Sequence, residues 1–154
     1  MDIIIHFTVS AVATFAFAKL FNAPVKELLY CGITGGIAWI IFFILSNNNL
    51  GVVLPMLISS FGLTIFARII AAIRRVPVTV YLVCGIFPLV PGRGVYYTIY
   101  YLITRESGLA GEYGLRTLEV AIAITFGIIF GSSIPQKFFN RFNKEYRNKK
   151  ELTK

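Results

Sequence analysis

The side chains best placed for chemistry lie in one short segment, PLVPGRG, inside an apolar stretch. Its prolines lack a backbone N–H and its glycines relax the backbone, so a helix cannot pass through it unbroken. Arg93 stands where a short helix over 95–103 would begin, and a helix N-terminus presents unpaired N–H groups. Because a guanidinium can hold a carboxylate through two parallel hydrogen bonds, we expect Arg93 to help bind an anionic or zwitterionic solute. The alternative is that Arg93 only extends to an aqueous vestibule or to lipid headgroups.

The substrate-binding residues expected at this break are Pro88, Pro91, Gly92, Arg93, Gly94, Tyr96 and Tyr97. In lipid, backbone groups freed by a break are tolerated only where protein or a water-filled cavity satisfies them. Discontinuous helices of this kind point to the substrate site of a transporter. Tyr96 and Tyr97 lie close enough to the break to line that site, whereas Tyr100 and Tyr101 are expected in an interfacial aromatic belt.

Three further ionisable residues within apolar stretches are candidates for proton coupling: Glu119, Arg68 and His6. Ionisable groups are costly in a membrane and serve as proton relays in transporters, and histidine changes charge near neutral pH. Each candidate also has a plainer interpretation. Arg68 can extend to the nearby surface, and Glu119 would open a helix whose dipole stabilises a carboxylate. His6 lies near the outer surface and begins a polar stripe with Ser10 and Thr14.

Five apolar segments are long enough to position these residues across a bilayer, since a spanning helix needs about 20 mostly apolar residues. Hydrophobic residues make up 56% of the 154-residue chain and charged residues only 14%. The predicted spans cover residues 3–21, 28–46, 50–73, 78–103 and 118–136. We therefore expect an all-α integral membrane protein, with one transmembrane domain over residues 1–136 and a fourth span that is broken.

The basic residues predict the orientation of the chain. Seven of the fifteen Lys and Arg residues lie in the tail 137–154, and placing it in the cytoplasm leaves few basic residues outside. The positive-inside rule then predicts a multi-pass protein of the plasma membrane, with the N-terminus outside and a basic cytoplasmic tail. The net charge of +8 needs no nucleic-acid partner, because a basic tail beside an anionic leaflet accounts for it.

Two segments of similar sequence indicate an internal repeat. Residues 24–33, PVKELLYCGI, match residues 77–86, PVTVYLVCGI, at six positions, and each segment opens a predicted span after a proline. Hairpins of spans 1–2 and 3–4 would then form a parallel repeat, the alternative being chance similarity of apolar segments. Glycines four residues apart, at 32 and 36 and at 127 and 131, predict close packing between helices.

The sequence lacks the patterns that are typical of enzymes and metal sites. Its single histidine and its two cysteines, Cys31 and Cys84, have no metal-ligand spacing. We also find no nucleophile with a neighbouring base and no phosphate-binding glycine loop. We therefore predict no catalytic residue, no metal site and no cofactor.

The stretch PLVPGRGVYYTIYYL resembles the signature of the threonine/serine exporter family, in which a P-x-x-P-G-x-x-x-Y pattern interrupts a span of the small membrane domain. FNAPVKELLYCGITGG and ITFGIIFGSSIP resemble that family's second and last spans, so the resemblance covers roughly residues 3–140. The chain length fits the short membrane subunit of a split, two-component exporter. The resemblance marks as the break and site region Pro88, Pro91, Gly92 and Tyr96. Arg93 departs from the family, which often has a small residue there.

The resemblance implies a secondary exporter of threonine and serine, driven by the proton motive force. It also implies a larger membrane subunit of the same family as partner, and the small number of spans suggests that a homo-oligomer could take its place. Some split members are linked to dicarboxylates, so a subunit of a succinate exporter is one alternative. The other is an assembly subunit that transports nothing, although such a subunit would have no need of a broken span.

Overall fold

The computed structural model describes residues 2–48, 50–135 and 138. All regular structure in these residues is helical, which confirms the predicted all-α class. In chain order the helices are α1 (Asp2–Leu20), η1 (Val25–Glu27), α2 (Leu28–Ser46), α3 (Val53–Arg74), α4 (Val78–Gly85), η2 (Phe87–Leu89), α5 (Gly92–Ile103) and α6 (Ser107–Ser133). Among the described helices, four are long and apolar enough to cross a membrane. A fifth span results if α4 with η2 and α5, which meet at a bend of 55°, are taken together.

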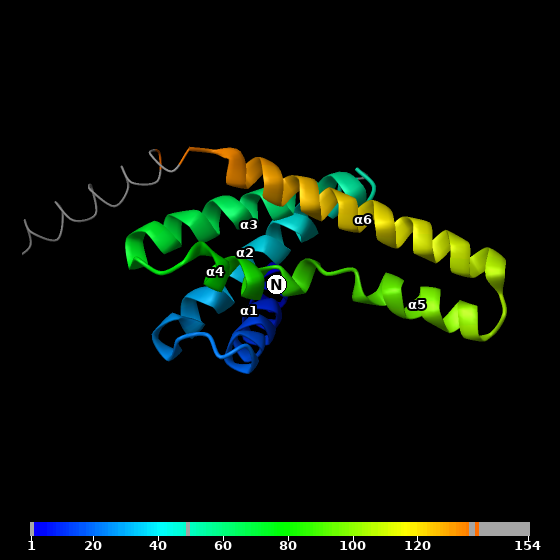
Figure 1. The fold of residues 1–154 in the computed structure, drawn as a ribbon, viewed down its shortest axis with the longest axis horizontal. Coiled ribbons are helices and arrows are strands. Elements are labelled where there is room, and N and C mark those ends of the chain that lie inside the picture. The colour runs from blue at the N-terminus through cyan, green and yellow to red at the C-terminus, as the bar shows by residue number, and fades with distance from the viewer. Residues whose placement is uncertain (1, 49, 136–137, 139–154) are drawn as a thin grey trace, which may run out of the picture.

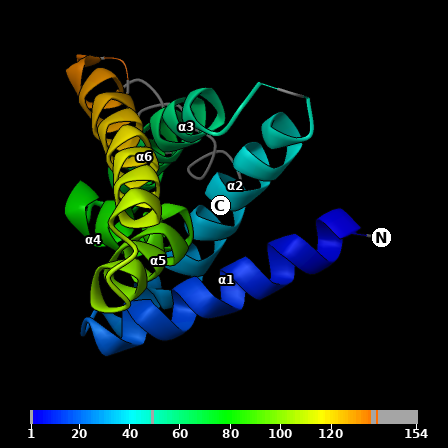
Figure 2. The same ribbon diagram turned by 90° about the vertical axis from the view of Figure 1, so that its right-hand side faces the viewer.

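Figures 1 and 2 show two pairs of neighbouring helices that cross each other. α1 lies along α2, and α3 lies along α6. α4 is placed where the pairs meet and contacts α1, α2 and α3. α5 runs back along the first half of α6, and this hairpin extends away from the other helices (Figure 1). The break between α4 and α5 therefore lies where the chain leaves the crossed helices and enters the hairpin.

α6 begins earlier than the sequence indicates. The predicted span started at residue 118, but the helix begins at Ser107. Most of residues 104–117, which the predicted spans leave as a polar loop, therefore form the first three turns of α6. Glycines in these turns lower the intrinsic helix propensity. Packing against α5 outweighs that preference, because the ring of Tyr113 lies 5.2 Å from that of Tyr97 and 5.4 Å from that of Tyr101, measured between centroids.

Glycines set the closest approaches between helices. A Cβ atom on Gly32 would lie 2.9 Å from the backbone oxygen of Ala11 in α1, and one on Gly127 would lie 2.5 Å from that of Leu57 in α3. Both distances are well below ordinary van der Waals contact. The predicted packing role of these small residues is confirmed, since larger side chains would force the helices apart.

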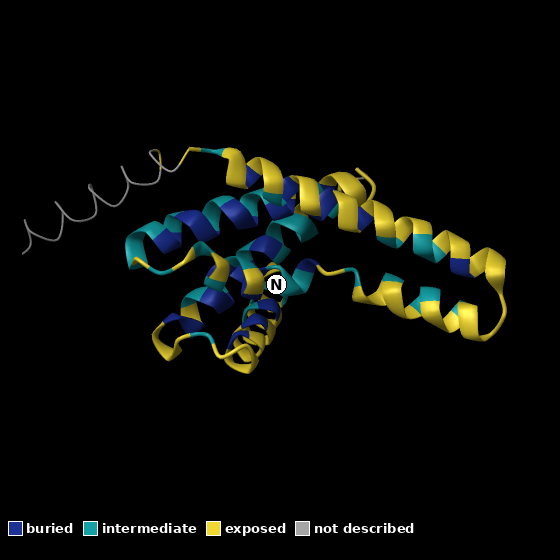
Figure 3. Cartoon of the chain, in the orientation of Figure 1, coloured by how far each residue is buried: buried dark blue, intermediate teal, exposed yellow. Residues whose placement is uncertain are grey.

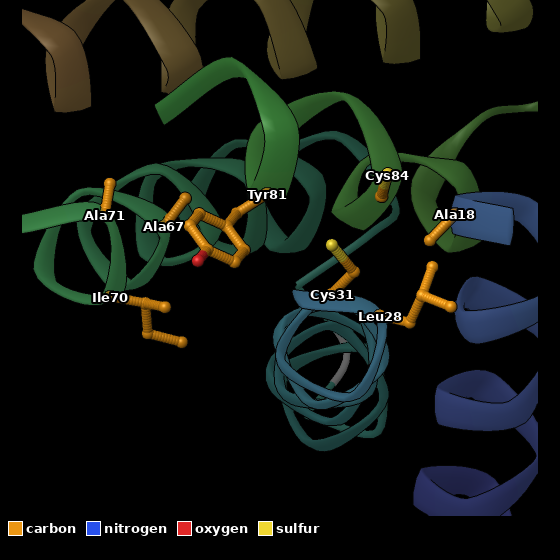
Figure 4. Packing of buried hydrophobic residues seen from close by; sticks show 8 residues of the cluster. All are labelled: Ala18, Leu28, Cys31, Ala67, Ile70, Ala71, Tyr81 and Cys84. Atoms are coloured by element: carbon orange, nitrogen blue, oxygen red, sulfur yellow. The ribbon is translucent and has the colours of Figure 1, made fainter. Parts of the chain in front are cut away.

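Buried residues concentrate where α2, α3 and α4 meet, whereas α5 contains no fully buried residue (Figure 3). One buried cluster joins the end of α1 and the start of α2 to α3 and α4, and Figure 4 shows Tyr81, Cys31 and Cys84 at its centre. A second cluster lies between α2, α3, η2 and α6, around Leu63 and Leu89. The core thus holds both sides of the break in place, while the hairpin of α5 and α6 exposes much of its surface.

The turn between α1 and α2 recurs between α3 and α4. Each turn has a residue with left-handed backbone two positions before its proline, and each proline has a φ of −54°. In each turn the residue before the proline donates its backbone N–H to a carbonyl five residues earlier, at 3.0 Å and 3.3 Å. The matching residues are Asn22 and Arg75, Ala23 and Val76, and Pro24 and Pro77. This repeated local geometry supports the predicted relation between the two hairpins.

Candidate functional site

The proline and glycine segment breaks the fourth span, as the sequence predicts. α4 ends at Gly85, a short η2 follows, and α5 begins at Gly92 after an extended Val90. Position 88 corresponds to Gly35 in the first repeat, where α2 continues without interruption. The divergence follows from Pro88 and Pro91, because neither proline can donate the backbone hydrogen bond that continues a helix.

Local hydrogen bonds satisfy part of the backbone at the break. The N–H of Leu89 bonds to the carbonyl of Ile86 at 2.8 Å, and that of Gly92 spans Pro91 to reach Val90 at 2.7 Å. The latter is an inverse γ-turn, since Pro91 has φ −75° and ψ 53°. The N-terminus of α5 has no side-chain cap, so the N–H groups of Arg93 and Gly94 in its first turn remain available to a ligand or to water.

A cavity of about 550 Å³ opens at the start of α5. Its walls come from α2, the start of α3, the break and one face of α6, and its polar members are Arg93, Tyr113, Arg116 and Thr117. The remaining lining is mostly apolar and includes Trp39, Phe42, Val52, Met56, Pro88, Val90, Pro91, Gly92, Gly94 and Val120. An apolar cavity with a few convergent polar groups is the usual form of a small-molecule site.

Two guanidinium groups give this cavity a positive character. Arg93 lies over the ring of Tyr97, with its central carbon 5.5 Å from the ring centroid. Arg116 pairs with Glu112 at 3.1 Å, but both side chains are largely exposed and such a pair is weak. Gly94 allows the first turn of α5 to approach α6, since a Cβ there would collide with the hydroxyl of Thr117. The cavity can therefore offer a carboxylate two cationic groups beside the positive end of a helix.

A smaller cavity of about 260 Å³ lies on the other side of the break. Its lining comes from α1, α2 and η2: His6, Val9, Ser10, Ala13, Thr14, Phe17, Trp39, Phe87 and Pro88. Trp39 and Pro88 line both cavities. The indole N–H of Trp39 donates to Nδ1 of His6 at 3.4 Å, and the imidazole lies 4.1 Å from the ring of Phe43 between centroids.

The structure brings five of the seven expected binding residues to the larger cavity, all but the two tyrosines. Tyr97 contributes indirectly, by lying under the guanidinium of Arg93. Tyr96 is 62% exposed and stacks on Tyr100, so it belongs to the row of aromatic rings on α5 and lies apart from the cavity lining.

The structure places the three candidates for proton coupling in three different environments. His6 lines the smaller cavity. Arg68 is buried and donates to the carbonyl oxygens of Gly131 and Ser132 at 2.9 Å and 2.6 Å, which satisfies the C-terminal end of α6. Glu119 is exposed in the middle of α6 and lines neither cavity, so the expectation that it stands in a first helical turn is wrong.

Sequence reasoning missed one buried cluster and several lining residues of the larger cavity, among them Arg116 and Trp39. Arg116 was placed in a loop, although its spacing of four from Glu112 is the signal of a helical ion pair. Trp39 lies within an apolar predicted span, and nothing in the sequence around it indicated that it lines a cavity.

The buried cluster joins the two repeated turns. The carboxylate of Glu27 accepts hydrogen bonds from Arg74 at 3.0 Å and 2.7 Å and from the hydroxyl of Tyr81 at 2.6 Å. Arg74 also lies over the ring of Tyr30, 4.5 Å from its centroid. Because Glu27 is buried and both partners come from other helices, the cluster fixes the ends of α2, α3 and α4 against one another. In the described residues no three His, Cys, Asp or Glu side chains come together as a metal site would require.

Comparisons with known proteins agree with the membrane fold. A family model described as "Threonine/Serine exporter, ThrE" matches residues 6–134. The chain is also similar to a "Probable threonine/serine exporter" of Mycobacterium tuberculosis (strain ATCC 25618 / H37Rv), with 24% identity over 110 residues. That match covers 71% of this chain and 21% of the relative, so the chain spans about a fifth of the relative's length. No solved structure matches this chain.

Proposed function

Since this chain belongs to the threonine/serine exporter family, we propose that it is the membrane-embedded part of a secondary exporter for threonine, serine or a related small carboxylate. The family is one of transporters, and several apolar helices make this chain a multi-pass membrane protein. The solute would enter the larger cavity with its carboxylate toward the start of α5.

The observation that carries this proposal is the coincidence of the broken span with a cavity of about 550 Å³ that is lined by Arg93 and Arg116. Half-helix N-termini in transporters face the carboxylates of their substrates. Here the start of α5 provides such a terminus, and Arg93 adds a bidentate partner beside it. The apolar lining would enclose the small side chain of the solute and keep water away from the ionic contact.

The transport unit is proposed to be larger than this chain. Its match covers only about a fifth of a related exporter, and five spans are few for a complete transporter. A larger membrane subunit of the same family would complete the path, or a second copy of the chain in a homo-oligomer. We further propose that the proton motive force drives export, with the N-terminus outside the plasma membrane. Residues 1–136 would form the exporter domain. Residues 137–154 would form the cytoplasmic tail, and they lie almost wholly outside the described residues.

A dicarboxylate such as succinate is the second candidate solute, and one observation favours it. Both Arg93 and Arg116 line the same cavity, so two carboxylates could each meet a guanidinium. A zwitterionic amino acid would place its ammonium group near the same positive charges, and would need an acceptor such as Glu112 to balance it.

Binding can be measured with the full chain in lipid nanodiscs, because Trp39 lines the cavity and is the only tryptophan. Threonine, serine or succinate should each change its fluorescence if bound. Arg93→Gln should weaken binding of the true substrate by about 10- to 100-fold, as a lost charge-assisted contact of ~1.5–3 kcal/mol implies. Arg105→Gln is the matched control, since Arg105 lies in the turn after α5 and lines neither cavity.

Transport is then tested by counterflow of labelled solutes into proteoliposomes, with and without the partner subunit. Equal transport by Arg93→Gln and the unsubstituted protein would reject the role of Arg93. If no solute moves with both subunits present, the chain is an assembly subunit and the exporter proposal fails.

A further inference from the structure

Two cavities share one tryptophan in their linings. Trp39 lines both the larger cavity and the smaller one, and Pro88 of the break also lines both. The larger cavity holds the two arginines, whereas the smaller one is mostly apolar and includes His6. The indole ring of Trp39 therefore borders both spaces.

One hydrogen bond to a histidine and a ring contact with Phe42, 5.3 Å between centroids, hold that indole in place. The indole N–H of Trp39 donates to Nδ1 of His6 at 3.4 Å, and an indole has no acceptor to offer in return. His6 can accept this bond only while Nδ1 carries no proton, because both nitrogens of an imidazolium are donors. Protonation of His6 therefore removes the contact and sets two N–H donors against each other.

The surroundings of His6 offer few other charges. On α1, Asp2 lies one helical turn before His6, and Lys19 lies at the opposite end. Among the described elements, α2, α4 and η2 pack against α1. None of the three contains Asp, Glu, Lys or Arg.

The titratable groups of α2 and α4 belong to or pack against the buried cluster that contains Ala18, at the far end of α1: Tyr30, Cys31, Tyr81 and Cys84 (Figure 4). Glu27 of η1 bonds to Tyr81 there. Ala18 is twelve residues from His6, about 18 Å along the helix. On the other side of Trp39, Arg93 and Arg116 face the larger cavity.

We propose that His6 and Trp39 form a proton-sensitive gate between the two cavities. With neutral His6 the indole is held in place and closes a path between the two cavities. With protonated His6 the bond is lost and the indole moves away. This assigns proton coupling to His6 among the three ionisable candidates, and its role in transport rests on the exporter function proposed above. In the proposed orientation His6 lies near the outer surface, where the proton motive force supplies protons.

The gate is tested first without transport, because the chain has one histidine and one tryptophan. The full chain in lipid nanodiscs is titrated between about pH 5 and 8, where histidine side chains change charge, while Trp39 emission is recorded. We expect one step, with lower emission and easier quenching by acrylamide at acidic pH. His6→Asn keeps an acceptor near the position of Nδ1 but cannot be protonated, so the step should disappear. Asp2→Asn is the control and should keep it.

A flat titration in the unsubstituted protein, or an equal step in His6→Asn, overturns the proposal. If circular dichroism shows that His6→Asn does not fold, His6→Gln replaces it, with the same expected loss of the step. The transport arm measures the initial rate of counterflow against pH. His6→Asn should lose the pH dependence of that rate, and an unchanged pH profile would refute the gate even if the fluorescence step is present. If the unsubstituted protein moves no solute, the exporter proposal fails, while emission and quenching still decide whether protonation of His6 releases Trp39.

Discussion

The substitution Gly127→Ala should separate α3 from α6. A Cβ atom at this position would lie 2.5 Å from the backbone oxygen of Leu57 and 2.9 Å from the backbone nitrogen of Phe61, and it would collide with the hydroxyl of Ser60. Ordinary contact begins near 3.4 Å, so the two helices must move apart by about 0.9 Å at this point. Rotation of a side chain cannot relieve the clash, because two of the three atoms belong to the backbone.

The expected magnitude follows from two opposing effects. Alanine is a better helix former than glycine by roughly 1 kcal/mol, and in open space this would stabilise the protein. Overpacking of a close contact typically costs about 1–3 kcal/mol, and the same separation would lengthen the bonds from Arg68 to the end of α6. We expect a net loss of about 1–2 kcal/mol in the free energy of unfolding.

A matched control lies on the same helix. A Cβ atom on Gly111 has no neighbouring atom within 4 Å, so Gly111→Ala should keep or raise stability by up to ~1 kcal/mol. Unfolding by sodium dodecyl sulfate in mixed micelles, followed by Trp39 fluorescence and circular dichroism, measures both variants. The close approach of α3 and α6 is refuted if Gly127→Ala is as stable as Gly111→Ala.

Two further predictions concern the buried carboxylate of Glu27 and the two buried cysteines. Glu27→Gln should lower the free energy of unfolding by about 2 kcal/mol, less than the ~3–5 kcal/mol of fully buried pairs because the side chain of Arg74 is 32% exposed. Glu112→Gln, in an exposed pair, should change it by less than ~0.5 kcal/mol, and equal losses in the two variants would contradict the burial argument. Cys31 and Cys84 lie side by side in Figure 4, so diamide should oxidise the two thiols to a disulfide and block maleimide labelling of both after the protein is denatured in sodium dodecyl sulfate. Labelling that persists after diamide would show that α2 and α4 do not meet there.

Much of the helical layout could be predicted from the sequence, because it depends on local properties of the chain. Apolar runs of spanning length give α1, α2 and α3 nearly to the residue, and two prolines are enough to end a helix near residue 88. Glycine spacing indicated which faces of α2 and α6 pack closely. The repeated PV and CGI segments likewise predicted two related hairpins, and the structure shows the same turn in both.

Only the tertiary structure shows which of the ionisable residues lies at a cavity. Charge and spacing made His6, Arg68 and Glu119 candidates, yet one lines a cavity, one caps α6 and one lies exposed. The early start of α6 and the placement of Arg93 and Arg116 at one cavity depend on contacts between α5 and α6. A membrane favours almost any apolar helix to nearly the same degree, so hydropathy locates the helices but not their partners. Only side-chain packing, through close glycine contacts and a few buried hydrogen bonds, selects which faces meet and where a cavity remains.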